Sequence, residues 1–228
     1  MLFMFWTHPE MAEPTSAPAW RALYPDFRVF GDDDVRPLLP MDIERIYDRI
    51  RLPSAKSDLA RLLLLKHHGG LYLDAHVGPG APEHLLETIL PLSRYNLILF
   101  GKGWAMKTES DFDLMNGIIA ARRGALELDV VINRLLSNLF IQWIKERGNP
   151  EYVPYGLFGL TGTYTLIQSF FDQQQPRPRI KDQYRDTVMV HYMQDNKRSG
   201  FELAAHYNYR RAGAHWSERE KNERFYLE

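Results

Sequence analysis

The stretch from Ser57 to Pro79, SDLARLLLLKHHGGLYLDAHVGP, decides the fold class expected for this chain. Its first half predicts a helix, because leucines recur at helical spacing in the residues that follow Ser54. Ser54 is the expected N-cap of that helix. Gly69 and Gly70 are expected to end that helix, since glycine tolerates the left-handed conformation common at helix ends. Residues 71–77 then alternate between apolar and polar side chains, which is typical of a strand. The stretch is that of an α/β protein.

Two groups of polar side chains stand out in this pattern. Asp58 and Arg61 are three residues apart, so both project from one face of the predicted helix. In an extended strand, Tyr72, Asp74 and His76 point to one side of the chain, away from the leucines. A polar strand end is where an α/β protein usually holds its ligand.

Composition limits the possible functions. The chain has 228 residues, 45% hydrophobic and 25% charged, which suits one α/β domain or one domain with a small helical insert. The formal net charge of −1 implies no polyanion-binding surface, and the lack of cysteine excludes a disulfide scaffold or a thiolate site. No apolar run reaches the ~18 residues of a spanning helix, and the apolar start lacks a basic leader. We therefore expect a cytoplasmic protein without a transmembrane segment, with delivery to a host cell left open.

The order S-D-x-x-R, hydrophobic run, G-G-L-Y-L-D resembles the sugar-binding region of DXD-motif glycosyltransferases. That family includes yeast-type mannosyltransferases, bacterial capsule and lipopolysaccharide transferases, and the large clostridial glucosylating toxins. The resemblance implies an α/β fold of the GT-A type, with a Rossmann-like, mainly parallel sheet, flanking helices and helical additions. It also implies transfer of a hexose, with retention of configuration, from a UDP- or GDP-sugar to an acceptor glycan or protein. No nucleic acid is an expected partner.

The resemblance implies four contacts to the donor sugar. Asp58 and Arg61 match the family's binders of sugar hydroxyls, and a carboxylate beside a guanidinium suits a vicinal diol. Tyr72 would lie against the donor. Asn116 lies in DLMNGIIAA, which resembles a family segment that approaches the sugar. The alternatives are an Asp58–Arg61 helix salt bridge and a helix N-cap at Asn116.

The resemblance also implies a metal site. Asp74 matches the first Asp of the motif, but His76 stands where the family has its second Asp. A divalent cation offsets the charge on the donor diphosphate, and imidazole favours Mn²⁺ over Mg²⁺. Binding should weaken below about pH 6, because a ligating imidazole must be neutral. A third ligand is expected from the tail, His215 or His206, which could equally be surface histidines.

Three residues are expected at the nucleotide. Relatives begin with a strand that ends in a Trp stacked on the base, and Trp6 resembles it; the alternative is a core Trp. Trp216 and Ser217 resemble a C-terminal His and Trp cluster that folds over the diphosphate. The resembled groups have no agreed protein nucleophile, so we assign no catalytic residue.

The remaining chain is expected to complete one glycosyltransferase domain over 1–228. The nucleotide-sugar core would occupy about 1–125, and the helical acceptor side with a C-terminal lid about 126–228. The pattern over Leu126–Glu146 predicts the longest helix, and Thr161 to Thr163 partly matches a family "TGP" turn that approaches the substrate.

Two rival functions differ in class from a transferase of sugars. A nucleotide-sugar-binding module without turnover is favoured by His76 in place of Asp. A nucleotidyl- or phosphotransferase is disfavoured, because the chain has no phosphate-binding GxxxxGK[ST] loop.

Overall fold

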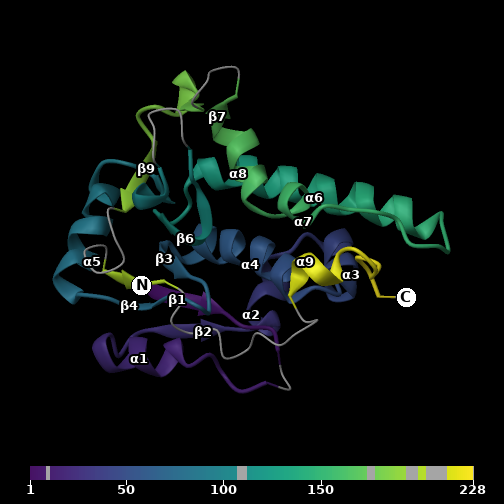
Figure 1. Ribbon diagram of the computed structural model, residues 1–228, viewed down its shortest axis with the longest axis horizontal. Coiled ribbons are helices and arrows are strands. Elements are labelled where there is room, and N and C mark those ends of the chain that lie inside the picture. The colour runs from purple at the N-terminus through teal and green to yellow at the C-terminus, as the bar shows by residue number, and fades with distance from the viewer. Residues whose placement is uncertain (9–10, 107–111, 174–177, 194–199, 204–214, 228) are drawn as a thin grey trace.

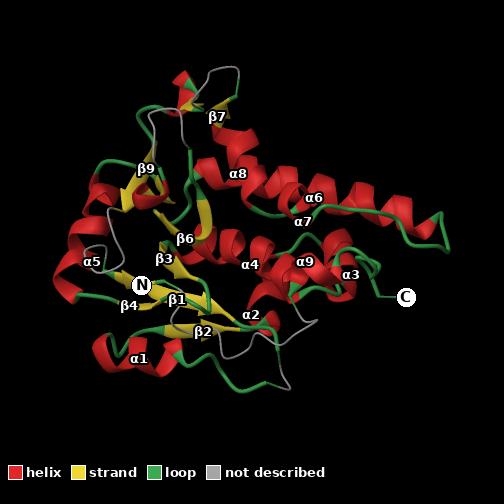
Figure 2. Ribbon diagram, viewed as in Figure 1, coloured by secondary structure: helices red, strands yellow, loops and turns green. Residues whose placement is uncertain are grey.

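The computed structural model describes residues 1–8, 11–106, 112–173, 178–193, 200–203 and 215–227. Its central sheet has six strands in the order β2-β1-β3-β6-β5-β9 (Figures 1 and 2). The strands are β1 (Leu2–Phe5), β2 (Arg28–Phe30), β3 (Gly70–Leu73), β5 (Leu97–Lys102), β6 (Met115–Ala121) and β9 (Val188–Met193). Of these, β6 runs antiparallel to both neighbours, and the other pairs are parallel.

Helices cover both faces of this sheet (Figure 2). They are α1 (Ser16–Leu23), α2 (Asp32–Val35), α3 (Met41–Arg49), α4 (Pro53–His68), α5 (Pro82–Ile89), α6 (Leu126–Arg147), α7 (Leu157–Leu160), α8 (Thr163–Phe170) and α9 (Trp216–Arg219). Two small antiparallel pairs, β4 (Gly78–Pro79) with β10 (Phe201–Glu202) and β7 (Phe171–Asp172) with β8 (Arg179–Ile180), lie outside the sheet. Short 3-10 turns span Arg36–Leu38, Leu90–Ser93, Gly103–Ala105 and Asp182–Tyr184.

Two hydrophobic clusters lie on opposite faces of the sheet. One packs Tyr72 and alternate residues of β5 and β6 against α3, α4, α6 and α8. The other packs Leu71 and Leu73 against Trp20 of α1 and Leu85 of α5. The alternation expected for β3 is therefore present, and the predicted α/β class with a mainly parallel sheet and flanking helices is confirmed. No described helix combines the length and apolar content needed to span a bilayer.

The predicted helix stop is confirmed, whereas the predicted helix start is wrong. Gly69 and Gly70 adopt φ of 67° and 105°, and the Gly69 amide donates to Leu65 O at 2.7 Å. At the other end, α4 begins at Pro53 with Leu52 as the extended N-cap, so Ser54 lies inside the first turn. Proline is favoured at the first helical position, where a missing N–H costs nothing.

The predicted strand 71–77 is too long. β3 ends at Leu73, after which the Asp74 amide donates to Gly117 O at 2.8 Å. The chain then turns, with Val77 N donating to Asp74 O at 2.9 Å. Asp favours turns because its side chain competes for backbone hydrogen bonds. The turn brings His76 back beside Asp74.

Two predictions beyond this stretch have clear outcomes. The long helix expected from Leu126 is confirmed as α6, which extends one residue further, to Arg147. Asn116 lies on strand β6, so the helix N-cap alternative for it is wrong.

Candidate functional site

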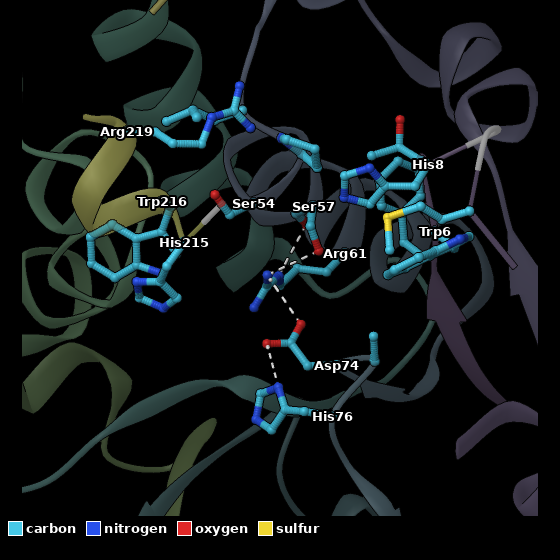
Figure 3. A pocket seen from close by; sticks show the side chains of 16 residues that line it. Trp6, His8, Ser54, Ser57, Arg61, Asp74, His76, His215, Trp216 and Arg219 are labelled. Carbon is cyan, nitrogen blue, oxygen red and sulfur yellow. Dashed lines mark hydrogen bonds and ion pairs between the residues drawn. The ribbon is translucent and has the colours of Figure 1, made fainter. Parts of the chain in front are cut away.

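A cavity of about 370 Å³ lies where the ends of β1 and β3 meet the start of α4 and α9 (Figure 3). Its size is in the range of small-molecule sites. It is lined by Phe5, Trp6, Thr7, His8, Met11, Leu52, Pro53, Ser54, Ser57, Arg61, Asp74, Ala75, His76, His215, Trp216 and Arg219. The two tryptophans come from opposite ends of the described chain.

Asp74 is held in a fixed orientation at the end of β3. Its Oδ1 accepts a hydrogen bond from Tyr72 OH at 2.7 Å and lies 3.3 Å from Nη2 of Arg61. Its Oδ2 lies 4.0 Å from Nδ1 of His76. A Cβ at Gly117 would come within 2.9 Å of that same Oδ2, so glycine on β6 leaves room for the carboxylate. One carboxylate oxygen is thus bound by protein donors while the other faces an imidazole in the cavity.

Arg61 forms the part of the cavity surface next to Asp74. Its guanidinium donates to Ser57 O at 3.0 Å, to Ser57 Oγ at 3.1 Å and to Asn116 O, and it lies over the ring of Tyr72. Burial alone would lower the pKa of Arg61, but the Asp74 and Asp58 carboxylates and Tyr72 raise it above its usual value. Arg61 therefore stays charged and couples Asp58 to Asp74.

Asp58 lies behind Arg61 and outside the main cavity. Its Oδ1 is 3.0 Å from Arg61 Nη2 and accepts from Asn116 Nδ2 at 2.8 Å, while its Oδ2 accepts from Thr161 Oγ1 at 2.8 Å. Burial raises the pKa of Asp58 to about 7, although Arg61 and Thr161 oppose the shift. Asp58, Asn116 and Thr161 line a second, small cavity of about 10 Å³, which Arg61 also borders. The salt-bridge alternative for Asp58 and Arg61 is thus present, within a larger network.

Tyr72 does not line the cavity, contrary to the expectation that it lies against the donor. Its side chain is fully buried, and its hydroxyl also bonds Ser57 Oγ at 2.8 Å. Burial raises the pKa of Tyr72 well above its usual value, so the hydroxyl keeps its proton and donates a hydrogen bond to Asp74. Tyr72 supports Asp74 from behind.

The C-terminal part of the described chain closes one side of the cavity. His215 and Trp216 line it, whereas Ser217 does not. Ser217 Oγ instead bonds Nδ1 of His215 at 2.7 Å, and the same nitrogen caps α9. At the other end of the chain, Trp6 lines the cavity with His8, and the two rings are 4.9 Å apart. Trp6 is therefore a cavity residue and not a core Trp.

Comparison with known proteins identifies the family of the central stretch. Residues 13–92 match the family described as glycosyltransferase sugar-binding region containing DXD motif. The resemblance seen in the sequence is confirmed. No curated protein sequence matches the chain. The matched segment contains Asp58, Arg61 and Asp74.

Several solved structures are similar to parts of this chain. The PaToxG glycosyltransferase matches with a TM-score of 0.43 and 14% identity, covering 74% of this chain and 67% of that chain. The UDP-bound glycosyltransferase domain from the YGT toxin matches with a TM-score of 0.46 and 11% identity, covering 81% of this chain and 57% of that chain. The catalytic domain of Clostridium novyi alpha-toxin matches with a TM-score of 0.36 and 14% identity, covering 58% of this chain and 35% of that chain. The chain thus spans only about a third to two thirds of the length of these structures.

The cavity residues that were not predicted from the sequence include His8 and Arg219. His8 follows Trp6 at the end of β1, and the rule that ligands bind at strand ends could have indicated it. Burial, with a smaller contribution from Arg219, lowers the pKa of His8, so it is neutral at pH 7. Arg219 forms a bidentate pair with Glu223, the closest contact being 2.8 Å. No local pattern indicates Arg219, because its place depends on how the C-terminal segment packs.

The expected three-ligand metal group is not formed in the part of the chain that the structure describes. No three His, Asp or Glu side chains lie close enough there to hold one ion. Asp74 and His76 form a pair, but His215 is not grouped with them and its Nδ1 bonds Ser217. His206 lies outside the described residues.

Proposed function

We propose that this chain is a metal-dependent glycosyltransferase that moves a hexose from a nucleotide sugar to an acceptor hydroxyl with retention of configuration. One observation carries the proposal: Asp74 is fixed by Tyr72 and Arg61 and presents its other oxygen to His76 in a cavity of ligand size. The family match over residues 13–92 supports the same reading.

Asp74 and His76 are the residues that would hold the cation. A carboxylate oxygen and an imidazole nitrogen 4.0 Å apart can approach one ion with small side-chain rotations. This mixed oxygen and nitrogen pair favours Mn²⁺ over Mg²⁺. When bound, the cation would stabilise the charge that develops on the leaving nucleoside diphosphate. Tyr72 and Arg61 hold the Asp74 carboxylate in its orientation.

The nucleotide would lie between the two ends of the described chain. Trp6 and Trp216 offer aromatic faces for a base, and their shared cavity also holds the cationic side chains of Arg61 and Arg219. Guanidinium groups match phosphate oxygens in geometry and charge. We propose UDP as the nucleotide part of the donor, and we assign Ser217 to orienting His215 rather than to the nucleotide.

The sugar would approach Arg61 and the polar network behind it. Asp58, Asn116 and Thr161 line the small cavity on the far side of Arg61. A small movement of the guanidinium would join the two cavities and expose this carboxylate and amide to sugar hydroxyls. We propose that residues from about 126 to 228, which also supply strand β9 to the sheet, form the acceptor side and a C-terminal lid.

A screen of nucleotide sugars tests this function. Parent protein should hydrolyse at least one UDP-sugar slowly without acceptor, and only with Mn²⁺ present. UDP should raise the melting temperature more with Mn²⁺ than with chelator. Absence of metal-dependent turnover and stabilisation with every donor would reject the proposal.

A binding module without turnover is the second candidate, favoured by the two-membered metal pair in the described residues. It predicts stabilisation by UDP or a UDP-sugar with no hydrolysis at any Mn²⁺ concentration. Product analysis separates this outcome from an active transferase.

A further inference from the structure

The segment formed by residues 215–227, here called the C-terminal arm, links the cavity to α6. Its first part lines the cavity with His215, Trp216 and Arg219. Its last part returns to the protein body, where Phe225 and Tyr226 are buried to 0% and 2% exposure in the core that includes α6. Figure 1 shows this arm in yellow beside α3.

Glu146 of α6 receives the end of the arm. Its side chain is 1% exposed, and its Oε1 accepts from Phe225 N and from Gln142 Nε2, both at 2.9 Å. Its Oε2 accepts from Tyr226 N at 3.1 Å, and Arg224 Nε lies 3.8 Å from it. A buried carboxylate is stable only when its oxygens are bonded. Two consecutive amides of the arm do that here.

Weaker anchors flank this carboxylate. Tyr226 OH donates to Leu139 O at 2.6 Å, and Leu227 N donates to Arg49 O at 2.7 Å. Nearer the cavity, Glu220 Oε2 accepts from Leu157 N at 2.8 Å. Helix α9 has four residues, too few to be stable without tertiary contacts. The position of Trp216 therefore depends on the anchors that follow it in the chain.

We propose that Glu146 is a positioning residue for the nucleotide site, acting through the arm. It is absent from the cavity lining, yet it fixes the arm on which His215 and Trp216 are carried into the cavity. The ligand side of this proposal rests on the proposed function, while the structural side, that Glu146 fixes the arm, stands independently.

Glu146→Gln is the informative variant. Glutamine has a single acceptor oxygen, so one arm amide would face an NH₂ group instead of an oxygen. Glu151→Gln is the control, because Glu151 is an exposed acid shortly after Glu146, in the connection that follows α6. Titration of UDP with Mn²⁺ by calorimetry should show Kd raised about tenfold in Glu146→Gln and unchanged in Glu151→Gln.

A double-mutant cycle separates positioning from general destabilisation. In the Trp216→Ala background, Glu146→Gln should change Kd by clearly less than tenfold, because one of the residues that Glu146 positions is gone. The same tenfold loss in both backgrounds would overturn the proposal. If Glu146→Gln does not fold, Tyr226→Phe takes its place in the cycle, since it removes one hydrogen bond of the arm.

Hydrogen exchange tests the arm without any ligand. Amides of Phe225, Tyr226 and α9 should lose protection in Glu146→Gln, while those of β3 and β6 keep it. If parent protein binds no UDP but the arm loses protection as expected, the nucleotide function fails and the dependence of the arm on Glu146 stands. Unchanged protection of the arm would overturn the positioning role even if UDP binds.

Discussion

At the scale of single residues, the site depends on a contrast between two carboxylates. Asp74 is partly exposed, with one oxygen bound by Tyr72 and Arg61 and the other facing His76. Asp58 is buried, with all its contacts inside the protein. The first is suited to an ion and the second to organising Arg61, and each role predicts a different response to loss of charge.

Asp74→Asn should abolish turnover while the melting temperature changes little. The variant keeps the side-chain volume but loses the charge that attracts a cation, so we expect at least about a 100-fold loss of Mn²⁺-dependent hydrolysis. Donor hydrolysis and thermal unfolding measured on the same preparation check this. Unfolding together with loss of activity would instead make Asp74 a structural residue.

His76 should determine metal preference. His76→Ala should raise the Mn²⁺ concentration required for half-maximal activity, and His76→Asp should keep activity with a shift of preference toward Mg²⁺. Metal titrations of the three proteins under one set of conditions give the answer. A His76→Ala curve that overlays the parent at every Mn²⁺ concentration would remove His76 from the ligand set.

Asp58 should make stability fall as the pH rises. Its pKa is about 7 in the folded protein against a usual value of 3.8, so between these pH values the folded state binds more protons than the unfolded state. The free energy of unfolding then decreases with rising pH, by at most about 4 kcal/mol from this group. Asp58→Asn should lack this contribution.

The measurement is urea unfolding of parent and variant from pH 4.5 to 8, with chelator present. The stability of Asp58→Asn relative to parent should rise across that range and level off above pH 7. A constant difference would mean that Asp58 titrates in the folded protein as it does in the unfolded chain.

At the scale of elements, strand β6 shapes the site from the side. Asn116 reaches Asp58, and the neighbouring Gly117 leaves the space that Asp74 occupies. Gly117→Ala would place a Cβ 2.9 Å from Asp74 Oδ2, so either the carboxylate or the strand must shift. We expect Mn²⁺ affinity to fall about tenfold or more, with the fold retained.

The control for this substitution is Gly156→Ala, where an added Cβ meets no atom within 4 Å. Metal affinity is read from the Mn²⁺ dependence of UDP stabilisation. Equal affinities in the two variants would show that Asp74 tolerates the added methyl group.

The same elements show how far the sequence could predict the structure. The end of α4 is set locally, because Gly69 and Gly70 have φ values that glycine readily adopts. The end of β3 is set by tertiary contacts, since its last residue, Leu73, pairs with Ile118 of β6 and the Asp74 amide after it donates to Gly117 O before the turn. Alternation alone could not reveal where that pairing stops.

The site residues, too, are partly predictable from local sequence and partly placed by tertiary packing. Asp58, Arg61 and Asp74 were found because one short stretch carries all three, and the structure brings them together. The placement of Tyr72 behind Asp74, and of Ser217 outside the cavity, follows from tertiary packing. His8 and Arg219 also escaped prediction, because neither belongs to the matching pattern.

At the scale of the whole molecule, the cavity is closed by residues from both ends of the described chain. Trp6 and His8 follow the first strand, while Trp216 and Arg219 belong to the last helix. Contacts of such long sequence separation form late, since their loop-closure entropy must be offset by structure already present.

This arrangement has a consequence for synthesis in the cell. The residues of β1, β3 and α4, with Asp58, Arg61 and Asp74, leave the ribosome long before Trp216 has been translated. At about 5–20 residues per second, translation from Asp74 to Trp216 takes several seconds or more, and a domain generally folds as a unit. A nucleotide site that includes Trp216 and Arg219 would thus stay incomplete until both residues have been translated.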